Sequence, residues 1–199
     1  MDLKTRAINM ITKPAAEWRV VASERQTVES LIKGYAAPLS AIPIVCSFIG
    51  VTLLVSVLPF MGGYSRGVVS GVIGGVVQWI LGLVGIVVCA IVIEMLAPKF
   101  NSTPNRVQAL KMVVFASTPL WLAGVFNLIP VLSLLILIAL AYSIYVFYLG
   151  LPPVMNTPQQ QVVPYMAISV LVMFFIAMVL GMISGMVALV IAGAAAVVS

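Results

Sequence analysis

Five long apolar segments, almost free of charged residues, follow a more polar start of about 35 residues. The segments lie at roughly residues 38–58, 68–97, 107–126, 130–149 and 163–191. Each is long enough to cross the hydrocarbon core of a bilayer, which takes about 20 residues of helix. Lipid offers backbone N–H and C=O groups no hydrogen-bond partner, so segments of this kind must be helical. The sequence therefore predicts an all-α polytopic integral membrane protein, with residues 36–199 forming a five-helix transmembrane bundle.

Residues 1–35 are predicted to form an amphipathic N-terminal arm on one face of this bundle. Apolar residues recur there at helical spacing in two stretches, and Pro14 suits the first turn of a second short helix. Two interpretations are open. The arm either packs on the membrane domain or lies in the headgroup layer. In the second case Trp18 would be its membrane-interface anchor, and Arg19 and Arg25 would face anionic lipid.

The distribution of lysine and arginine predicts the orientation. The arm carries six of the ten cations. The loop after the first segment carries one, Arg66, and the region after the second segment carries three, Lys99, Arg106 and Lys111. Short cytoplasmic flanks carry the positive excess in membrane proteins. With five spans, a cytoplasmic N-terminus places nine cations inside and one outside. We therefore expect the N-terminus in the cytoplasm and the C-terminus on the other side.

The composition argues against several kinds of chemistry. The chain has no histidine, and Cys46 and Cys89 both lie in apolar segments. The usual metal, haem and nucleophile–histidine sites are therefore not expected. No phosphate-binding glycine motif is present. Four acidic residues are mixed with the six cations of the arm, so it does not indicate a nucleic-acid-binding surface. We expect no metal, no cofactor, no nucleic acid and no enzymatic activity.

Glycines recur every four residues in two of the predicted helices. They are Gly67, Gly71 and Gly75 in the second segment and Gly181 and Gly185 in the fifth. Small residues at this spacing clear one face of a helix, so that another backbone can approach it closely. The pattern indicates helix packing, either within the chain or between two copies in a homodimer.

The third segment is the weakest of the five because Ser117, Thr118 and Pro119 interrupt it. Proline has no N–H, and its ring clashes with the carbonyl four residues earlier, here that of Phe115. We therefore expect Pro119 to kink the third helix. The two neighbouring hydroxyl groups can satisfy part of the freed backbone.

Glu94 is the only acidic residue between Ser30 and the C-terminus, and an ionised carboxylate in hydrocarbon is costly. At about 1.5 Å per residue it lies roughly 6 Å from Pro98, where the second helix should end at the cytoplasmic face. Polar residues of the third and fourth helices fall at a similar depth. We expect a hydrogen-bonded intramembrane cluster of Glu94, Ser117, Thr118, Tyr145 and Lys111, with Arg106 as another possible cation. The alternatives are a shallow glutamate that reaches water, or a proton relay.

Four stretches carry a family resemblance: "KPAAEWRVVASE" (13–24), "GYAAPLSAIP" (34–43), "FASTPLWLAGVFNLIP" (115–130) and "AYSIYVFYLGLPPVM" (141–155). Their order and spacing resemble the Yip family, the Ypt/Rab-interacting membrane proteins, in its bacterial branch. The resemblance implies five spans, a bacterial inner membrane location and no catalytic residues. Eukaryotic members bind prenylated small GTPases and act in vesicle traffic. Their long acidic N-terminal region and Asp-Leu-Tyr-Gly-Pro-like sequence are absent here, and "GYAAP" is the nearest counterpart.

The function that these observations favour is non-enzymatic. The protein would be a membrane-organising or partner-binding scaffold, with a protein partner on its cytoplasmic face. The alternative is a small transporter or lipid-handling protein with a polar cavity around Glu94 and the kinked third helix. A cavity that reaches Glu94 would favour the alternative, and a tightly packed interior would favour the scaffold. Neither the partner, the substrate nor the oligomeric state follows from the residues.

Overall fold

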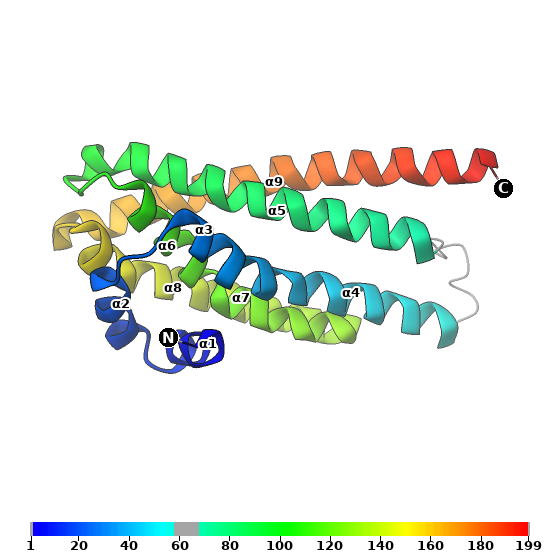
Figure 1. Cartoon of the computed structure of the whole chain (residues 1–199), viewed down its shortest axis with the longest axis horizontal. Coiled ribbons are helices and arrows are strands. Elements are labelled where there is room, and N and C mark those ends of the chain that lie inside the picture. Colours follow the sequence, from blue (N-terminus) through cyan, green and yellow to red (C-terminus); the bar gives the residue numbers. More distant parts are fainter. Residues whose placement is uncertain (1, 58–67, 199) are drawn as a thin grey trace.

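The structure is a computed structural model that describes residues 2–57 and 68–198. These residues form helices joined by short connections, and no strand occurs among them (Figure 1). The helices are α1 (Leu3–Thr12), α2 (Pro14–Ser23), α3 (Val28–Leu31), α4 (Ala37–Val57), α5 (Val68–Leu96), α6 (Arg106–Ala116), α7 (Thr118–Ala123), α8 (Ile136–Met155) and α9 (Gln159–Val198). Five helical segments within this range are long and apolar enough to cross a membrane. The predicted all-α polytopic fold is confirmed.

The first membrane helix begins ten residues before the predicted start at Pro38, because α3, a π turn (Ile32–Ala36) and α4 run on as one span from Val28. A capping box starts it: Thr27 and Ser30 each accept a hydrogen bond from the other's backbone N–H. The π turn ends just before Pro38, the residue that cannot donate an intrahelical hydrogen bond.

The third span is the centre of the bundle. In the span Arg106–Leu128, 72% of the most apolar 18-residue stretch is buried within the protein, whereas the corresponding share in Gln159–Val190 is 6%. It contacts α5 on one side and α8 on the other. The polar interruption that makes it the weakest of the predicted spans is compatible with this position. A helix that faces other helices can carry Ser, Thr and Lys, whereas one that faces lipid cannot.

The helices form two layers along the length of the bundle. In Figure 1, α5 and α9 run side by side above, and α4, α7 and α8 lie below them. The arm helices α1 and α2 sit at one end, together with the end of α5 and the starts of α6 and α9; we call this the arm end. The fully buried aromatic and aliphatic side chains, such as Trp18, Phe115, Phe147 and Tyr165, belong to this end. The two layers are joined there by packed side chains, and beyond it α5 also approaches α4 closely at Gly71 and Gly75.

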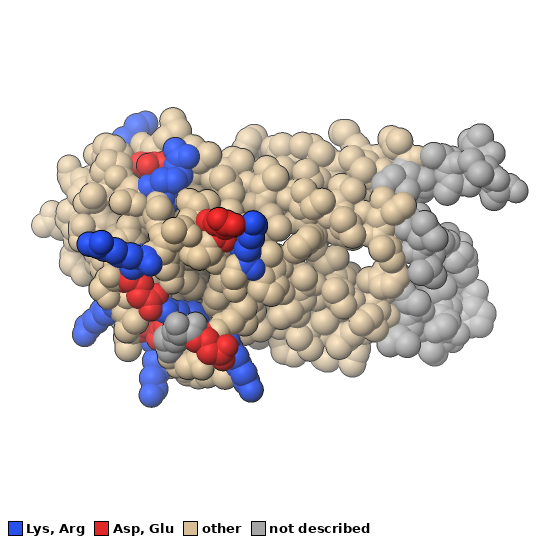
Figure 2. Space-filling model, viewed as in Figure 1, with Lys and Arg blue, Asp and Glu red and all other residues tan. Residues whose placement is uncertain are grey.

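Charged residues gather at the arm end. On the face shown in Figure 2, the lysine, arginine, aspartate and glutamate side chains lie over this part, and the rest of the described surface is uncharged. Beyond it, exposed apolar residues cover α5, α8 and α9, as expected for helices surrounded by acyl chains. Arg66 lies outside the described residues.

Candidate functional site

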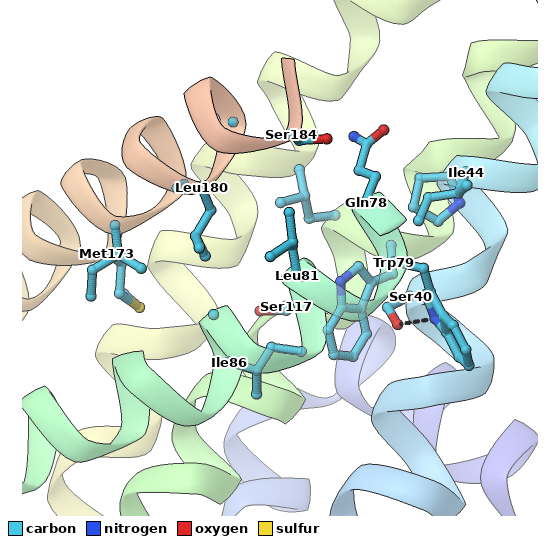
Figure 3. A pocket seen from close by; sticks show the side chains of 18 of the residues that line it. Ser40, Ile44, Gln78, Trp79, Leu81, Ile86, Ser117, Met173, Leu180 and Ser184 are labelled. Atoms are coloured by element: carbon cyan, nitrogen blue, oxygen red, sulfur yellow. Dashed lines mark hydrogen bonds between the residues drawn. The ribbon is translucent and has the colours of Figure 1, made fainter. Parts of the chain in front are cut away.

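A large cavity lies between the two layers beyond the arm end. Its volume is about 1200 Å³, and its walls come from α4, α5, α8 and α9, with the junction of α6 and α7 closing one side. Figure 3 shows side chains that line it from different helices, such as Ile44 of α4, Ile86 of α5 and Leu180 of α9. Most of the wall is aliphatic, aromatic or glycine. None of the described residues that line it is charged.

Polar side chains are few in these walls, and several are already bonded. Trp79 Nε1 donates to Ala37 O and to Ser40 Oγ, both at 3.1 Å. Ser117 Oγ donates to Val113 O at 2.7 Å, within its own helix. Asn127 Nδ2 donates to a backbone carbonyl of α4 at 3.4 Å. The bonds of Trp79 and Asn127 join different helices, and all three side chains have a hydrogen-bond partner within the protein.

The cavity is closed toward the arm end by packed aromatic side chains. The rings of Tyr35 and Phe115 meet edge to face with their centroids 4.7 Å apart. The Trp18 ring also meets the Phe115 ring edge to face, at a centroid distance of 6.2 Å. Tyr35 Oη and Thr118 Oγ1 lie 2.9 Å apart in a buried hydrogen bond. On the other layer, Tyr165 Oη donates to a carbonyl of α5 at 2.7 Å. The site therefore lies in the half of the bundle away from the charges.

The two predicted glycine stripes have different surroundings. A Cβ added at Gly71 would lie 2.9 Å from Phe48, and one at Gly75 would lie 3.3 Å from Ile44, so these glycines let α5 approach α4. A Cβ at Gly181 or Gly185 would meet no atom within 4 Å, and both residues line the cavity. The α5 stripe is thus used within the chain. Gly67 lies outside the described residues, and the homodimer stays a prediction.

The structure does not bring the five predicted cluster residues together. Glu94 forms an ion pair with Arg106, close to the start of α6. Lys111 donates to two backbone carbonyls at the end of α2, and Tyr145 is half exposed. Within the described chain, no hydrogen bond joins any two of the five. Residues at equal depth on different helices face different directions, and depth alone could not show this.

Pro119 lies just after an interruption of the third span. The helix α6 ends at Ala116, and α7 begins at Thr118 with Pro119 in its first turn. Proline is well tolerated there because the N–H that it lacks would have no intrahelical partner. The expected interruption takes the form of a break between two helices, and Ser117 occupies the break.

The arm is a folded part of the membrane domain. Trp18 is completely buried, and its Nε1 donates to Val146 O of α8 at 2.8 Å. The prediction of Trp18 as a membrane-interface anchor is therefore corrected, and of the two interpretations the structure has the packed arm. The indole fits because Gly150 has no side chain: a Cβ there would lie 2.7 Å from the ring. Arg19 and Arg25 are exposed, on the outer side of the arm.

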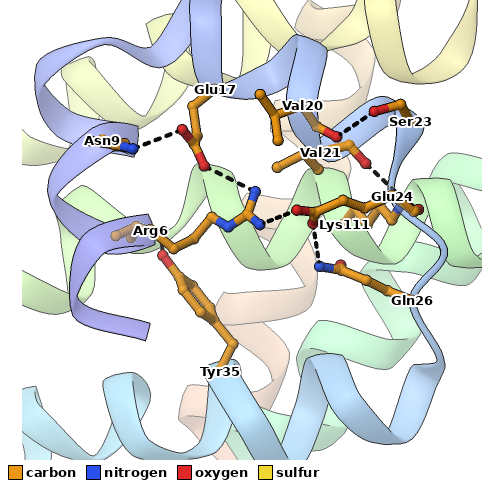
Figure 4. A network of polar contacts seen from close by, with 11 residues as sticks. Arg6, Asn9, Glu17, Val20, Val21, Ser23, Glu24, Gln26, Tyr35 and Lys111 are labelled. Atoms are coloured by element: carbon orange, nitrogen blue, oxygen red, sulfur yellow. Dashed lines mark hydrogen bonds and ion pairs between the residues drawn. The ribbon is translucent and has the colours of Figure 1, made fainter. Parts of the chain in front are cut away.

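A buried ionic network that was not predicted from the sequence holds the arm together (Figure 4). Arg6 is 4% exposed and lies 2.9 Å from Glu17 and 2.5 Å from Glu24, with its guanidinium 5.5 Å from the centre of the Phe115 ring. Lys111 Nζ donates to Val21 O at 2.8 Å and to Glu24 O at 2.6 Å. The one available signal was that Arg6 and Glu17 sit on the apolar stripes of their helices.

We expect Glu94→Leu to be well tolerated. Its partner Arg106 is 52% exposed, and ion pairs of this kind contribute about 0–1 kcal/mol. The unfolding free energy of the variant in mixed micelles should therefore change by no more than about 1 kcal/mol. A loss of several times that amount would show that Glu94 has a structural role beyond this pair.

The comparisons with known proteins agree with this architecture. The sequence model of the Yip1 domain family matches residues 8–181. The chain belongs to this family. The match covers α2 and reaches into α9, so it includes most of the helices around the cavity.

Two curated relatives of this Yip1-domain protein share 26% identity over 177 residues, covering 82% of this chain and 88% of theirs. Both are named inner membrane protein YohC, from Escherichia coli strains K12 and CFT073. No solved structure matches the chain.

Proposed function

We propose that this protein is a non-enzymatic lipid-binding protein of the bacterial inner membrane, which takes the acyl chains of a membrane lipid into the cavity between its two helix layers. The observation that carries the proposal is the cavity itself, about 1200 Å³ in volume with an uncharged and mostly apolar wall. The location follows the relatives, which are named inner membrane proteins.

The surroundings of the cavity favour an acyl chain as its occupant. Ligand pockets usually have volumes of about 300–1000 Å³, so this one is large enough for a lipid tail. Water is poorly held by walls of this kind, because a water molecule needs two or more polar partners. Acyl chains, by contrast, surround the bundle on all sides of its membrane-spanning part. They are the apolar molecules present at the highest concentration beside the site.

The proposal is the lipid-handling alternative of the sequence analysis, but its site is the cavity between the two helix layers rather than the surroundings of Glu94. Glu94 and Tyr145 are not among the residues that line the cavity, and Ser117 is the only member of the predicted polar cluster that does. The uncharged wall also gives no path for a proton or an ion. We therefore propose binding and handling of lipid, without ion-coupled transport.

A photoactivatable lipid tests the proposal. The protein would be placed in vesicles of phosphatidylethanolamine and phosphatidylglycerol that contain a phosphatidylglycerol with a diazirine on its acyl chain. After irradiation, adducts should map to inward-facing positions such as Ile86, Phe147 and Met173. Lipid-facing positions such as Val131 and Leu137, which are 77% and 63% exposed, give the background.

A cavity-filling variant makes this test specific. Gly181→Leu together with Gly185→Leu adds two side chains where neither Cβ meets an atom within 4 Å. The variant should fold normally and lose most of the adducts in the cavity wall, while background adducts persist. Ala167→Leu on an exposed face of α9 is the matched control. Adducts confined to the background positions, or wall adducts that the double variant leaves unchanged, would contradict lipid binding.

A second candidate, the partner-binding scaffold, is supported by the surface of the arm end. Among the described residues, Lys4, Lys13, Arg19, Arg25 and Lys99 are exposed and have no ion-pair partner, whereas the glutamates are paired. With the N-terminus in the cytoplasm, these cations would face acidic partners or anionic headgroups. Crosslinking in native membranes, followed by identification of what is captured at Arg19 and Arg25, would test this candidate.

A further inference from the structure

Several polar side chains in the cavity wall, Gln78, Ser143 and Ser184 among them, have no hydrogen-bond partner within the described residues. The amide of Gln78 points into the cavity from α5, and the hydroxyl of Ser184 points in from α9 (Figure 3). Within residues 2–57 and 68–198, neither side chain has a hydrogen bond or an ion pair. An amide or hydroxyl in apolar surroundings costs free energy unless something bonds to it. The wall is therefore built to receive a polar group at this point.

The chemistry of that group follows from the two side chains. An amide has two N–H donors beside its carbonyl acceptor, and a hydroxyl has one donor and also accepts, so the three donors can bond to a molecule with neutral hydrogen-bond acceptors. No charged side chain lies among the described lining residues, so nothing there would offset a phosphate or a carboxylate within the cavity. Ester carbonyl groups meet both conditions.

The depth of Gln78 agrees with this chemistry. It lies 18 residues before Leu96, the last residue of α5 at the arm end, which corresponds to about 27 Å along the helix. The hydrocarbon core is about 30 Å thick. Gln78 is thus near the far boundary of the hydrocarbon, the level at which the glycerol esters of that leaflet begin. From Gln78 the cavity extends toward the arm end as far as Ile86 and Cys89, and in the other direction as far as Gly71, between mostly apolar walls.

We propose that Gln78 and Ser184 bind the glycerol-ester group of a glycerophospholipid whose acyl chains extend down the cavity toward the arm end. Gln78 Nε2 donates to an ester carbonyl, and the phosphate lies on the side of Gln78 away from the arm end, at the level of the headgroups. This inference rests on the proposed lipid-binding function and adds the part of the lipid that is recognised and its direction in the site.

Two probes that differ only in this group test the inference. One is a diester phosphatidylglycerol and the other its diether analogue, each with a diazirine at the end of one acyl chain. Ether oxygens are weaker acceptors than ester carbonyls, so the diester should label the wall of the cavity about two- to tenfold more efficiently, the ratio expected for a neutral hydrogen bond. Adducts of both probes should lie near Ile86 and Cys89, the arm-end side of the cavity.

The variant Gln78→Leu should keep the adducts and lose the preference for the diester. Gln160→Leu, at an exposed amide at the start of α9, should keep both and is the matched control. Equal labelling by diester and diether in the unchanged protein, or a preference that survives in Gln78→Leu, would overturn the ester site while leaving acyl-chain binding intact. Labelling of the wall by neither probe would overturn the proposed function as well.

Discussion

Replacing Arg6 by methionine is expected to lower the unfolding free energy of the protein by about 3–5 kcal/mol, the cost of removing one partner from a buried ion pair. Arg6 is 4% exposed, and its guanidinium contacts Glu17 and Glu24. Glu17, which is 5% exposed, would be left as a buried carboxylate bonded only to Asn9. Methionine keeps the length and apolar stem of the side chain, so the loss would reflect the charge. Unfolding in mixed micelles measures it.

Two further variants separate the ion pair from other effects. Lys4→Met removes a cation from the exposed side of the same helix and should change the unfolding free energy by no more than about 0.5 kcal/mol. Arg6→Met combined with Glu17→Met should recover much of the loss, because a buried ion pair can often be replaced by apolar side chains. If Arg6→Met unfolds like Lys4→Met, the network does not stabilise the arm.

Replacing Trp18 by alanine is the second large effect that we expect. The indole is fully buried between the arm and the membrane domain, and truncating a buried aromatic residue costs about 3–5 kcal/mol. It also removes the hydrogen bond to Val146 O. Both losses lie at the contact between α2 and α8, so the arm should detach before the rest unfolds. Hydrogen exchange of the amides in α1 and α2 should rise far more than that of α6.

Two variants serve as controls for Trp18→Ala: one at another position of the same helix, and one with a different side chain at position 18. Val20 is 45% exposed, so Val20→Ala should change the unfolding free energy by no more than about 0.5 kcal/mol. Trp18→Phe keeps the aromatic contact with Phe115 but loses the N–H donor, and its cost should fall between the two. Equal hydrogen exchange in Trp18→Ala and in the unchanged protein would show that the arm stays docked without the indole.

Much of the architecture could be predicted because the bilayer restricts it. The second predicted segment, 68–97, differs from α5 (Val68–Leu96) by one residue at its end. The fifth ends within α9, and the prediction of a second short helix starting at Pro14 is confirmed. A run of apolar residues in lipid has few structural options other than a helix, so hydropathy alone locates these elements. The family resemblance, carried by four short stretches, is also confirmed.

The site was harder to predict, because it is defined by contacts between side chains, whereas the sequence shows only how deep each residue lies in the membrane. Glu94 and Lys111 were expected to meet, yet each bonds to a different partner. Gly181 was assigned to helix packing and instead lines the cavity. The rotation of each helix about its axis decides such outcomes, and in a helix that is apolar on all sides the pattern of residues carries little information about rotation.

The sequence by itself determined the class of protein, the membrane spans and the family, because each depends on the transfer free energies of consecutive residues or on short ordered motifs. Only the tertiary structure decided that the arm is folded against α8, that Arg6 is buried, and that α4, α5, α8 and α9 enclose a cavity of about 1200 Å³. These features depend on distances between residues far apart in the chain, and packing sets those distances.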